Sequence, residues 1–163
     1  MASSRTGAAM LAASVTLALS SAGPALADNY VWAVYPLDGG RTHLSYGVPE
    51  TDDIAIGFTC RRGSGRALVA LSLPGDYPGR AVGSRWPVTV NLHSGAIRRT
   101  YRFSATMSEL GAGVQDQPIA LSDPLVRAFI ASGRMGDARG DWPAETDGER
   151  RAIRNFFAGC ARR

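Results

Sequence analysis

The chain has no lysine, only two cysteines and, after its first 20 residues, no apolar run long enough to cross a membrane. It also lacks the C-x-x-C, H-E-x-x-H and G-x-S-x-G motifs, which are typical of redox proteins, zinc proteases and α/β hydrolases. These absences exclude a transmembrane helix in the later part of the chain. They also leave no catalytic motif on which an enzymatic function could be argued, and no cofactor is expected.

The first 27 residues have the pattern of a secretory signal peptide. Arg5 lies in a short n-region, Ala8 to Leu19 is an apolar stretch too short to span a bilayer, and Ala25 to Ala27 resembles a signal-peptidase site. We expect cleavage between Ala27 and Asp28. Because no cysteine stands at the cleavage point, a lipid anchor is not predicted. The alternative, a buried first helix of a cytosolic domain, fits the charge placement and the small residues before Asp28 poorly.

The expected mature chain, residues 28–163, has a length typical of one domain. Apart from two histidines, all basic residues are arginines, and 18 of them stand against 14 acidic residues in the whole chain. The excess of positive charge is small and spread along the chain, so we expect no nucleic-acid partner. The predicted location is the periplasm or the extracellular medium, with the protein in soluble form.

Export makes the two cysteines informative, because an oxidising compartment favours a disulfide between an isolated pair. Cys60 and Cys160 would close a loop of about 100 residues, for which the chain-entropy model gives about 4–5 kcal/mol as an upper figure. The alternatives are a free reactive thiol or a metal pair, and no histidine stands beside either cysteine to support the second. We therefore predict a structural disulfide.

Between the cysteines, and before Cys60, the apolar residues follow the two-residue period of β-strands. The predicted strands lie within Tyr30 to Tyr35, Thr42 to Tyr46, Ile54 to Cys60, Ala67 to Leu73, Val88 to Leu92 and Ile97 to Phe103. Turn residues separate these runs, and we also expect a turn over Leu110 to Pro118. The close spacing of strands and turns predicts an antiparallel β-sandwich or barrel-like domain, with Cys60 on the inward face.

The end of the chain changes to a helical period. Asp123 followed by Pro124 is typical of a helix start, and the pattern predicts a short helix over residues 123–132. Thr146 and Glu149 have the spacing of a capping box, and they predict an amphipathic helix over residues 147–160. The fold class is therefore mainly β (α+β), with a C-terminal helix that Cys160 clamps to the strand ending at Cys60.

An acidic cluster, Glu50, Asp52 and Asp53, precedes the strand that ends at Cys60. Three acids within four positions suit a weak divalent-metal site, or an acid that works with His43 in a secreted hydrolase. The simpler interpretation is a turn, which Pro49 presets and which Thr51 or Asp52 closes by a side-chain hydrogen bond to the backbone. No EF-hand pattern is present.

Arginines offer a second functional hint. They gather in two groups, Arg61, Arg62 and Arg66 around one turn and Arg98, Arg99 and Arg102 on one strand. If the strands are neighbours, Arg61, Arg62, Arg66, Arg98 and Arg102 form a basic face that binds an anionic partner. A solvated face without a partner is the alternative. Arg99 falls on the apolar side of its strand, so it is either buried against an acid or placed beyond the core.

Three segments together resemble small exported bacterial proteins that have no characterised activity. They are "LSYGVPETDD", the strand ending in Cys60, and the terminal helix ending in "NFFAGC". The resemblance covers most of the mature chain, supports export and the disulfide, and lends no functional residues. We therefore expect an exported, soluble binding module without evident catalysis, whose partner is a cell-envelope protein or an anionic glycan. The alternative is a secreted hydrolase or divalent-metal-binding protein that uses the acidic cluster with His43.

Overall fold

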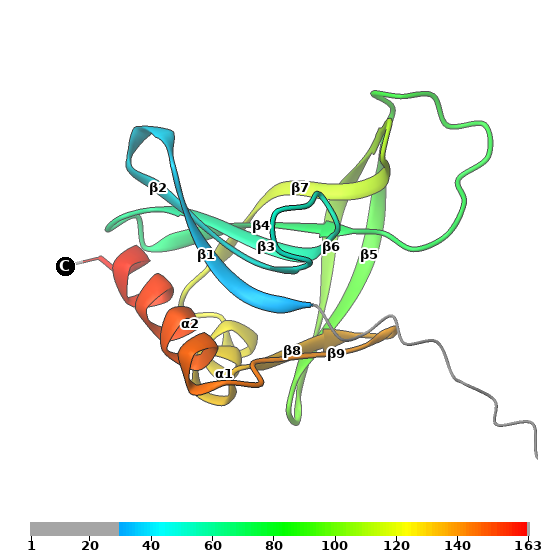
Figure 1. Cartoon of the computed structure of the whole chain (residues 1–163). Helices are drawn as coiled ribbons and strands as arrows, with labels where there is room; N and C mark the ends of the chain where they lie inside the picture. Colours follow the sequence, from blue (N-terminus) through cyan, green and yellow to red (C-terminus); the bar gives the residue numbers. More distant parts are fainter. Residues whose placement is uncertain (1–29, 163) are drawn as a thin grey trace, which may run out of the picture.

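Nine strands form one curled antiparallel sheet in a computed structural model of the chain, which describes residues 30–162 (Figure 1). The predicted leader, residues 1–27, lies outside the described residues. The order across the sheet is β1-β2-β3-β4-β7-β6-β5-β8-β9. The strands are β1 (Val31–Leu37), β2 (Arg41–Gly47), β3 (Ile54–Arg61), β4 (Arg66–Ser72), β5 (Arg85–Ser94), β6 (Ile97–Ser108), β7 (Gly111–Ala120), β8 (Arg134–Asp137) and β9 (Gly140–Pro143). The prediction of a mainly β, antiparallel, barrel-like domain is confirmed.

Both predicted helices are present, as α1 (Pro124–Ser132) and α2 (Asp147–Cys160). Asp123 caps α1 by accepting a hydrogen bond from the backbone N–H of Leu125 at 2.8 Å. The capping box at the start of α2 is formed by Thr146 and Glu149, as expected. Within the described residues we find no helix with the length and apolar character needed to cross a membrane.

The core lies between the helices and one face of the sheet. Phe58 of β3 contacts Phe129 of α1 and Phe157 of α2, with ring centroids 5.9 and 5.5 Å apart. Trp32 of β1 completes this aromatic cluster, with its ring centroid 4.7 Å from that of Phe129. All four side chains are buried, and each buries enough apolar surface to contribute about 1.5–3 kcal/mol to folding.

The disulfide predicted between Cys60 and Cys160 is present, and it joins the end of β3 to the last residue of α2. Two backbone hydrogen bonds support the same junction. Gly63 donates to the carbonyl of Gly159 at 2.9 Å, and Gly65 donates to the carbonyl of Cys160 at 2.8 Å. The turn between β3 and β4 is therefore held against the end of α2.

A second junction ties the start of α2 to β1, which is an edge strand of the sheet. The backbone N–H of Trp32 donates to Oε1 of Glu149 at 2.9 Å, while Oε2 of the same carboxylate accepts from the backbone N–H of Thr146 at 2.8 Å. Burial raises the pKa of Glu149, but the hydrogen bonds from Trp32 and Thr146 outweigh this effect and bring the pKa below its ordinary value.

Two parts of the sheet differ from the prediction. The segment predicted as a turn, Leu110 to Pro118, is mostly strand β7, which lies between β4 and β6 and pairs with both. Its glycines and polar residues have low β propensity, and pairing on both sides overrides that propensity. The short strands β8 and β9 were also not predicted, because a strand of four residues is too short to show a clear period.

Replacing both cysteines, as Cys60→Ser with Cys160→Ser, is expected to lower the free energy of unfolding by up to about 4–5 kcal/mol. The reason is that the unfolded chain regains the freedom of the long loop closed by the bond. Urea unfolding of the oxidised protein, the reduced protein and the double variant measures this effect. An oxidised and a reduced sample that unfold at the same urea concentration would contradict the prediction.

Replacing Glu149 by Gln is expected to lower the free energy of unfolding by about 1–3 kcal/mol at neutral pH, because charge-assisted hydrogen bonds are lost. The pKa of Glu149 is lower in the folded than in the unfolded protein. Its stabilising effect is therefore complete above the unfolded-state pKa, about 4.3, and is lost as the pH falls through the folded-state pKa. Urea unfolding at a series of pH values checks this. The difference between wild type and Glu149→Gln should shrink in acid, and a control variant, Glu145→Gln, should show little change at any pH.

Candidate functional site

The side chains of β2 and β3 alternate between a face that meets the helices and a face that points away from them, which we call the outer face. Leu44 and Phe58 pair across the two strands on the helix side and are fully buried. The adjacent pair, His43 and Thr59, lies on the outer face. The predicted functional residues of β2, β3 and β4 are positioned by this alternation.

Three arginines form a row across the outer face, at the end of the sheet near the disulfide. Arg41 pairs with Arg61 across β2 and β3. Arg66 on β4 continues the row. Thr59 of β3 pairs with Leu68 of β4 in an antiparallel arrangement, so Arg61, two residues after Thr59, lies opposite Arg66, two residues before Leu68. Neighbouring strands are about 4.8 Å apart, so the three backbone positions span about 10 Å. All three arginines are exposed.

Two more arginines, Arg62 and Arg162, extend this row. The five residues form what we call the arginine cluster: Arg41, Arg61, Arg62, Arg66 and Arg162. Arg62 lies in the turn between β3 and β4, and the side chain of Arg162 packs so close to Gly65 that a methyl group there would come within 2.8 Å of its Nε atom. The ion pairs found in residues 30–162 involve none of the five arginines. The positive charge of the cluster is therefore not neutralised by a neighbouring carboxylate in this part of the chain.

The second predicted group of arginines lies elsewhere. Arg98 and Arg102 are on β6, and β7 separates β6 from β4, so the two groups do not form one continuous row. Arg98 lines a separate hollow of about 580 Å³ together with His93. The guanidinium of Arg99 is half exposed and stands 4.0 Å from the carboxylate of Asp123, so this residue is both outside the core and beside an acid.

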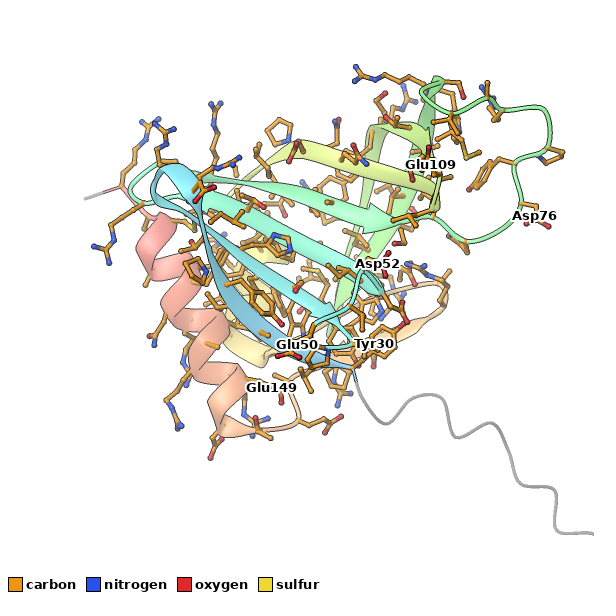
Figure 2. The ribbon with its side chains drawn as sticks, turned by 45° about the horizontal axis from the view of Figure 1, so that its top comes forward. Tyr30, Glu50, Asp52, Asp76, Glu109 and Glu149 are labelled. Atoms are coloured by element: carbon orange, nitrogen blue, oxygen red, sulfur yellow. A yellow bond between two sulfur atoms is a disulfide. The ribbon has the colours of Figure 1, made fainter. Side chains whose placement is uncertain are left out.

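The acidic turn and His43 line one groove of about 680 Å³. Gly57 and Ala70, which pair across β3 and β4, lie in its lining on the outer face. Asp52 and Asp53 also line it, from the loop that leads into β3, and Figure 2 labels Asp52 on this loop. The structure therefore brings Asp52 and Asp53 to the same groove as His43, whereas Glu50 is not among the residues that line it.

His43 makes no hydrogen bond or ion pair with these acids in the described structure. Its Nδ1 atom is 2.9 Å from the hydroxyl of Thr59, and burial lowers its pKa below the ordinary value. The ring lies over Gly57, where a Cβ atom would be 2.6 Å from Cε1 of His43. Asp53 stands four residues before Gly57, which is about 13 Å along an extended strand. The side chains thus share a groove without forming a catalytic pair.

The acidic stretch itself is a hydrogen-bonded turn, and Thr51 closes it as one of the two expected residues. Its hydroxyl donates to the carbonyl of Val48 at 2.9 Å and accepts from the backbone N–H of Asp53 at 3.1 Å. One oxygen of Asp53 also accepts from the hydroxyl of Tyr30 at 2.6 Å, and this bond raises the pKa of Tyr30 to about 12. Glu50 occupies a left-handed conformation with φ 62°, which is strained for a residue with a side chain.

Three groupings were missed from the sequence. Arg41 joins the arginine cluster through strand pairing, and a correct β2–β3 register would have placed it opposite Arg61. Asp76, from the loop between β4 and β5, lines the groove with Asp52 and Asp53. The third grouping is a hydrogen bond between Nε2 of His93 and the carboxylate of Asp141 at 2.7 Å, which depends on the unpredicted β8 and β9.

No three His, Cys, Asp or Glu side chains among residues 30–162 gather closely enough to hold a metal ion. Comparison with known proteins adds no relative: no family model, curated protein or solved structure matches the chain. The function is therefore argued from the geometry of the outer face.

Glu50→Gly is expected to raise the free energy of unfolding by about 0.5–1 kcal/mol, because glycine adopts the left-handed conformation without steric strain. Glu50→Val is expected to lower it, since a β-branched residue fits this conformation worst. Thermal unfolding of both variants beside wild type measures the two shifts. If the variants shift the midpoint in the same direction, strain at Glu50 does not control the stability of this turn.

Proposed function

We propose that the protein is an exported, non-catalytic binding module whose arginine cluster docks on an acidic surface of a cell-envelope protein. The observation that carries this proposal is the row formed by Leu37, Arg41, Arg61 and Arg66. Leu37 pairs with Arg41 across β1 and β2, and the three arginines follow on successive strands. An exposed apolar residue and three arginines without carboxylate partners in the described chain thus stand side by side.

The apolar neighbours of the cluster favour a protein partner over a glycan. Tyr35 and Leu37 of β1 lie on the outer face, where they pair with His43 and Arg41, and they are 37% and 40% exposed although both are large apolar or aromatic residues. Arginine and aromatic residues are enriched in protein interfaces, where apolar anchors supply much of the affinity and charges supply orientation and association rate. A purely electrostatic glycan site does not need this apolar strip.

Docking is expected to use side chains and not the addition of a strand to β1. The backbone N–H of Trp32, which points away from β2, is already bonded to Glu149. Because backbone direction alternates along the strand, the backbone nitrogens of Val34 and Pro36 also point away from β2, and proline has no N–H to donate. Only Val34 is left with a free outward donor in β1, which is too few for a stable added strand.

Two further points support an envelope or extracellular setting. The leader pattern predicts export, and the long-range disulfide is typical of an oxidising compartment. Guanidinium groups also bind carboxylates through paired hydrogen bonds, which suits an acidic partner surface.

Charge reversal, as Arg61→Glu with Arg66→Glu, is expected to weaken binding of an acidic partner at least about tenfold, because attraction becomes repulsion. The probe is a fluorescent peptide of alternating glutamate and leucine, and fluorescence anisotropy at low and high salt measures its affinity. Added salt should also weaken wild-type binding, since the interacting charges are exposed.

The matched control is Arg98→Glu with Arg102→Glu, which makes the same change of charge on β6 and should leave the affinity nearly unchanged. Equal loss in both double variants would mean that net charge, and not the cluster, controls binding. Leu37→Ser tests the apolar strip. If a sulfated polysaccharide binds more tightly than the peptide and Leu37→Ser has no effect on either, the partner is a glycan and the proposed protein interface is wrong.

A further inference from the structure

The groove lined by Gly57 and Ala70 has the size and lining of a site for a small molecule. Its volume of about 680 Å³ falls within the range of about 300–1,000 Å³ that is usual for ligand pockets. Leu73 lines it together with the small residues Gly57 and Ala70, while the side chain of Val114 is buried in the core. An apolar body can therefore rest on the small and apolar residues of β3 and β4, beside the polar side chains of His43 and Gln115, which also line the groove.

The charged residues of this groove are all acidic. Asp52 and Asp53 come from the loop before β3, and Asp76 comes from the loop between β4 and β5 (Figure 2). No arginine is among the described residues that line it, although the chain has 18 arginines. None of the three carboxylates takes part in the ion pairs of residues 30–162. The groove thus carries negative charge that no basic side chain of the described protein neutralises.

His43 does not supply the missing positive charge. It lines the same groove, and burial lowers its pKa, so its ring is neutral at pH 7. The carboxylates are also too dispersed to act on one small ion, since no group of three acidic or other ligating side chains in the described residues can hold a metal. A larger cation with diffuse contacts is the complementary ligand.

We propose that this groove binds a small organic cation with an apolar body, whose ammonium or guanidinium group is attracted by the separate carboxylates of Asp52, Asp53 and Asp76 while its apolar part rests on Ala70 and Leu73. Both parts of the ligand are needed. The carboxylates are exposed, and exposed ion pairs contribute about 0.2–1 kcal/mol each. Charge alone therefore gives weak binding, and the apolar floor supplies the rest by removing apolar surface from water.

Hexylamine is a direct probe, with hexanol, hexanoate and 1,6-diaminohexane as matched controls for charge and for the apolar end. Titration followed by amide NMR spectra locates the bound ligand and gives its dissociation constant. We expect hexylamine to bind most tightly of the four, with the largest shifts at Gly57, Ala70 and Gly113. Hexanoate should bind most weakly, because the groove is acidic.

Asp52→Asn with Asp76→Asn is expected to weaken hexylamine binding about five- to tenfold and to leave hexanol binding unchanged. Neither side chain has a hydrogen bond or ion pair in the described structure, so the thermal midpoint should stay close to that of wild type. The control is Asp38→Asn with Glu145→Gln, which removes two exposed acids outside the groove and should leave hexylamine binding unchanged.

Four outcomes would overturn the proposal. The first is hexanoate binding as tightly as hexylamine, the second is equal binding of hexylamine to wild type and to Asp52→Asn with Asp76→Asn, and the third is a set of NMR shifts outside the groove. Tighter binding of 1,6-diaminohexane than of hexylamine would exclude a role for the apolar floor and would also contradict it. None of these outcomes bears on the arginine cluster, which is tested with separate variants.

Discussion

The Cys60–Cys160 disulfide joins the end of β3 to the end of α2, and the basic end of the outer face depends on it. Cys60 is the last core residue of a strand that also carries Phe58, and Cys160 ends a helix that packs Phe157 against that ring. The same junction holds the β3–β4 turn against the helix through two backbone hydrogen bonds. A single covalent link thus orders the core contact and, directly outside it, the turn that carries Arg61, Arg62 and Arg66.

The outer face separates positive from negative charge along the length of β3. The arginine row stands at Arg61, and the carboxylates stand at the loop that precedes Ile54, so the two ends are about 23 Å apart in an extended strand. This distance exceeds the Debye length of about 8 Å at physiological salt. Attraction between the two ends is therefore largely screened, and each end can select its own ligand. The neutral His43 and the small residues Gly57 and Ala70 occupy the space between them.

Local sequence patterns predicted much of the fold because the physical causes are local. Asp123, Pro124 and the pair Thr146 and Glu149 define helix starts through bonds within one turn, and both helices begin where these residues predict. With only two cysteines in a chain that is expected to be exported, the disulfide pairing needed no further choice. Strand β7 could not be predicted this way, because its glycine-rich sequence is made extended by β4 and β6 on either side. Because β7 was not predicted, its place between β4 and β6 was missed as well. The condition for one basic face, that the strands carrying Arg61 and Arg98 are neighbours, is therefore not met.

The sequence by itself determined the elements whose cause lies within a few residues: the alternation of β2 and β3, the caps of α1 and α2, the presence of a turn after Pro49, and the availability of Cys60 and Cys160 for a bond. Tertiary structure decided which charged residues meet. Arg41 joins Arg61 only through strand register, Arg162 reaches Gly65 only because the disulfide brings α2 to the turn, and Asp76 reaches the groove of Asp52 only across the sheet. The physical reason is that side-chain alternation is a property of each strand, whereas the neighbours of a strand depend on hydrogen bonds and packing with distant segments.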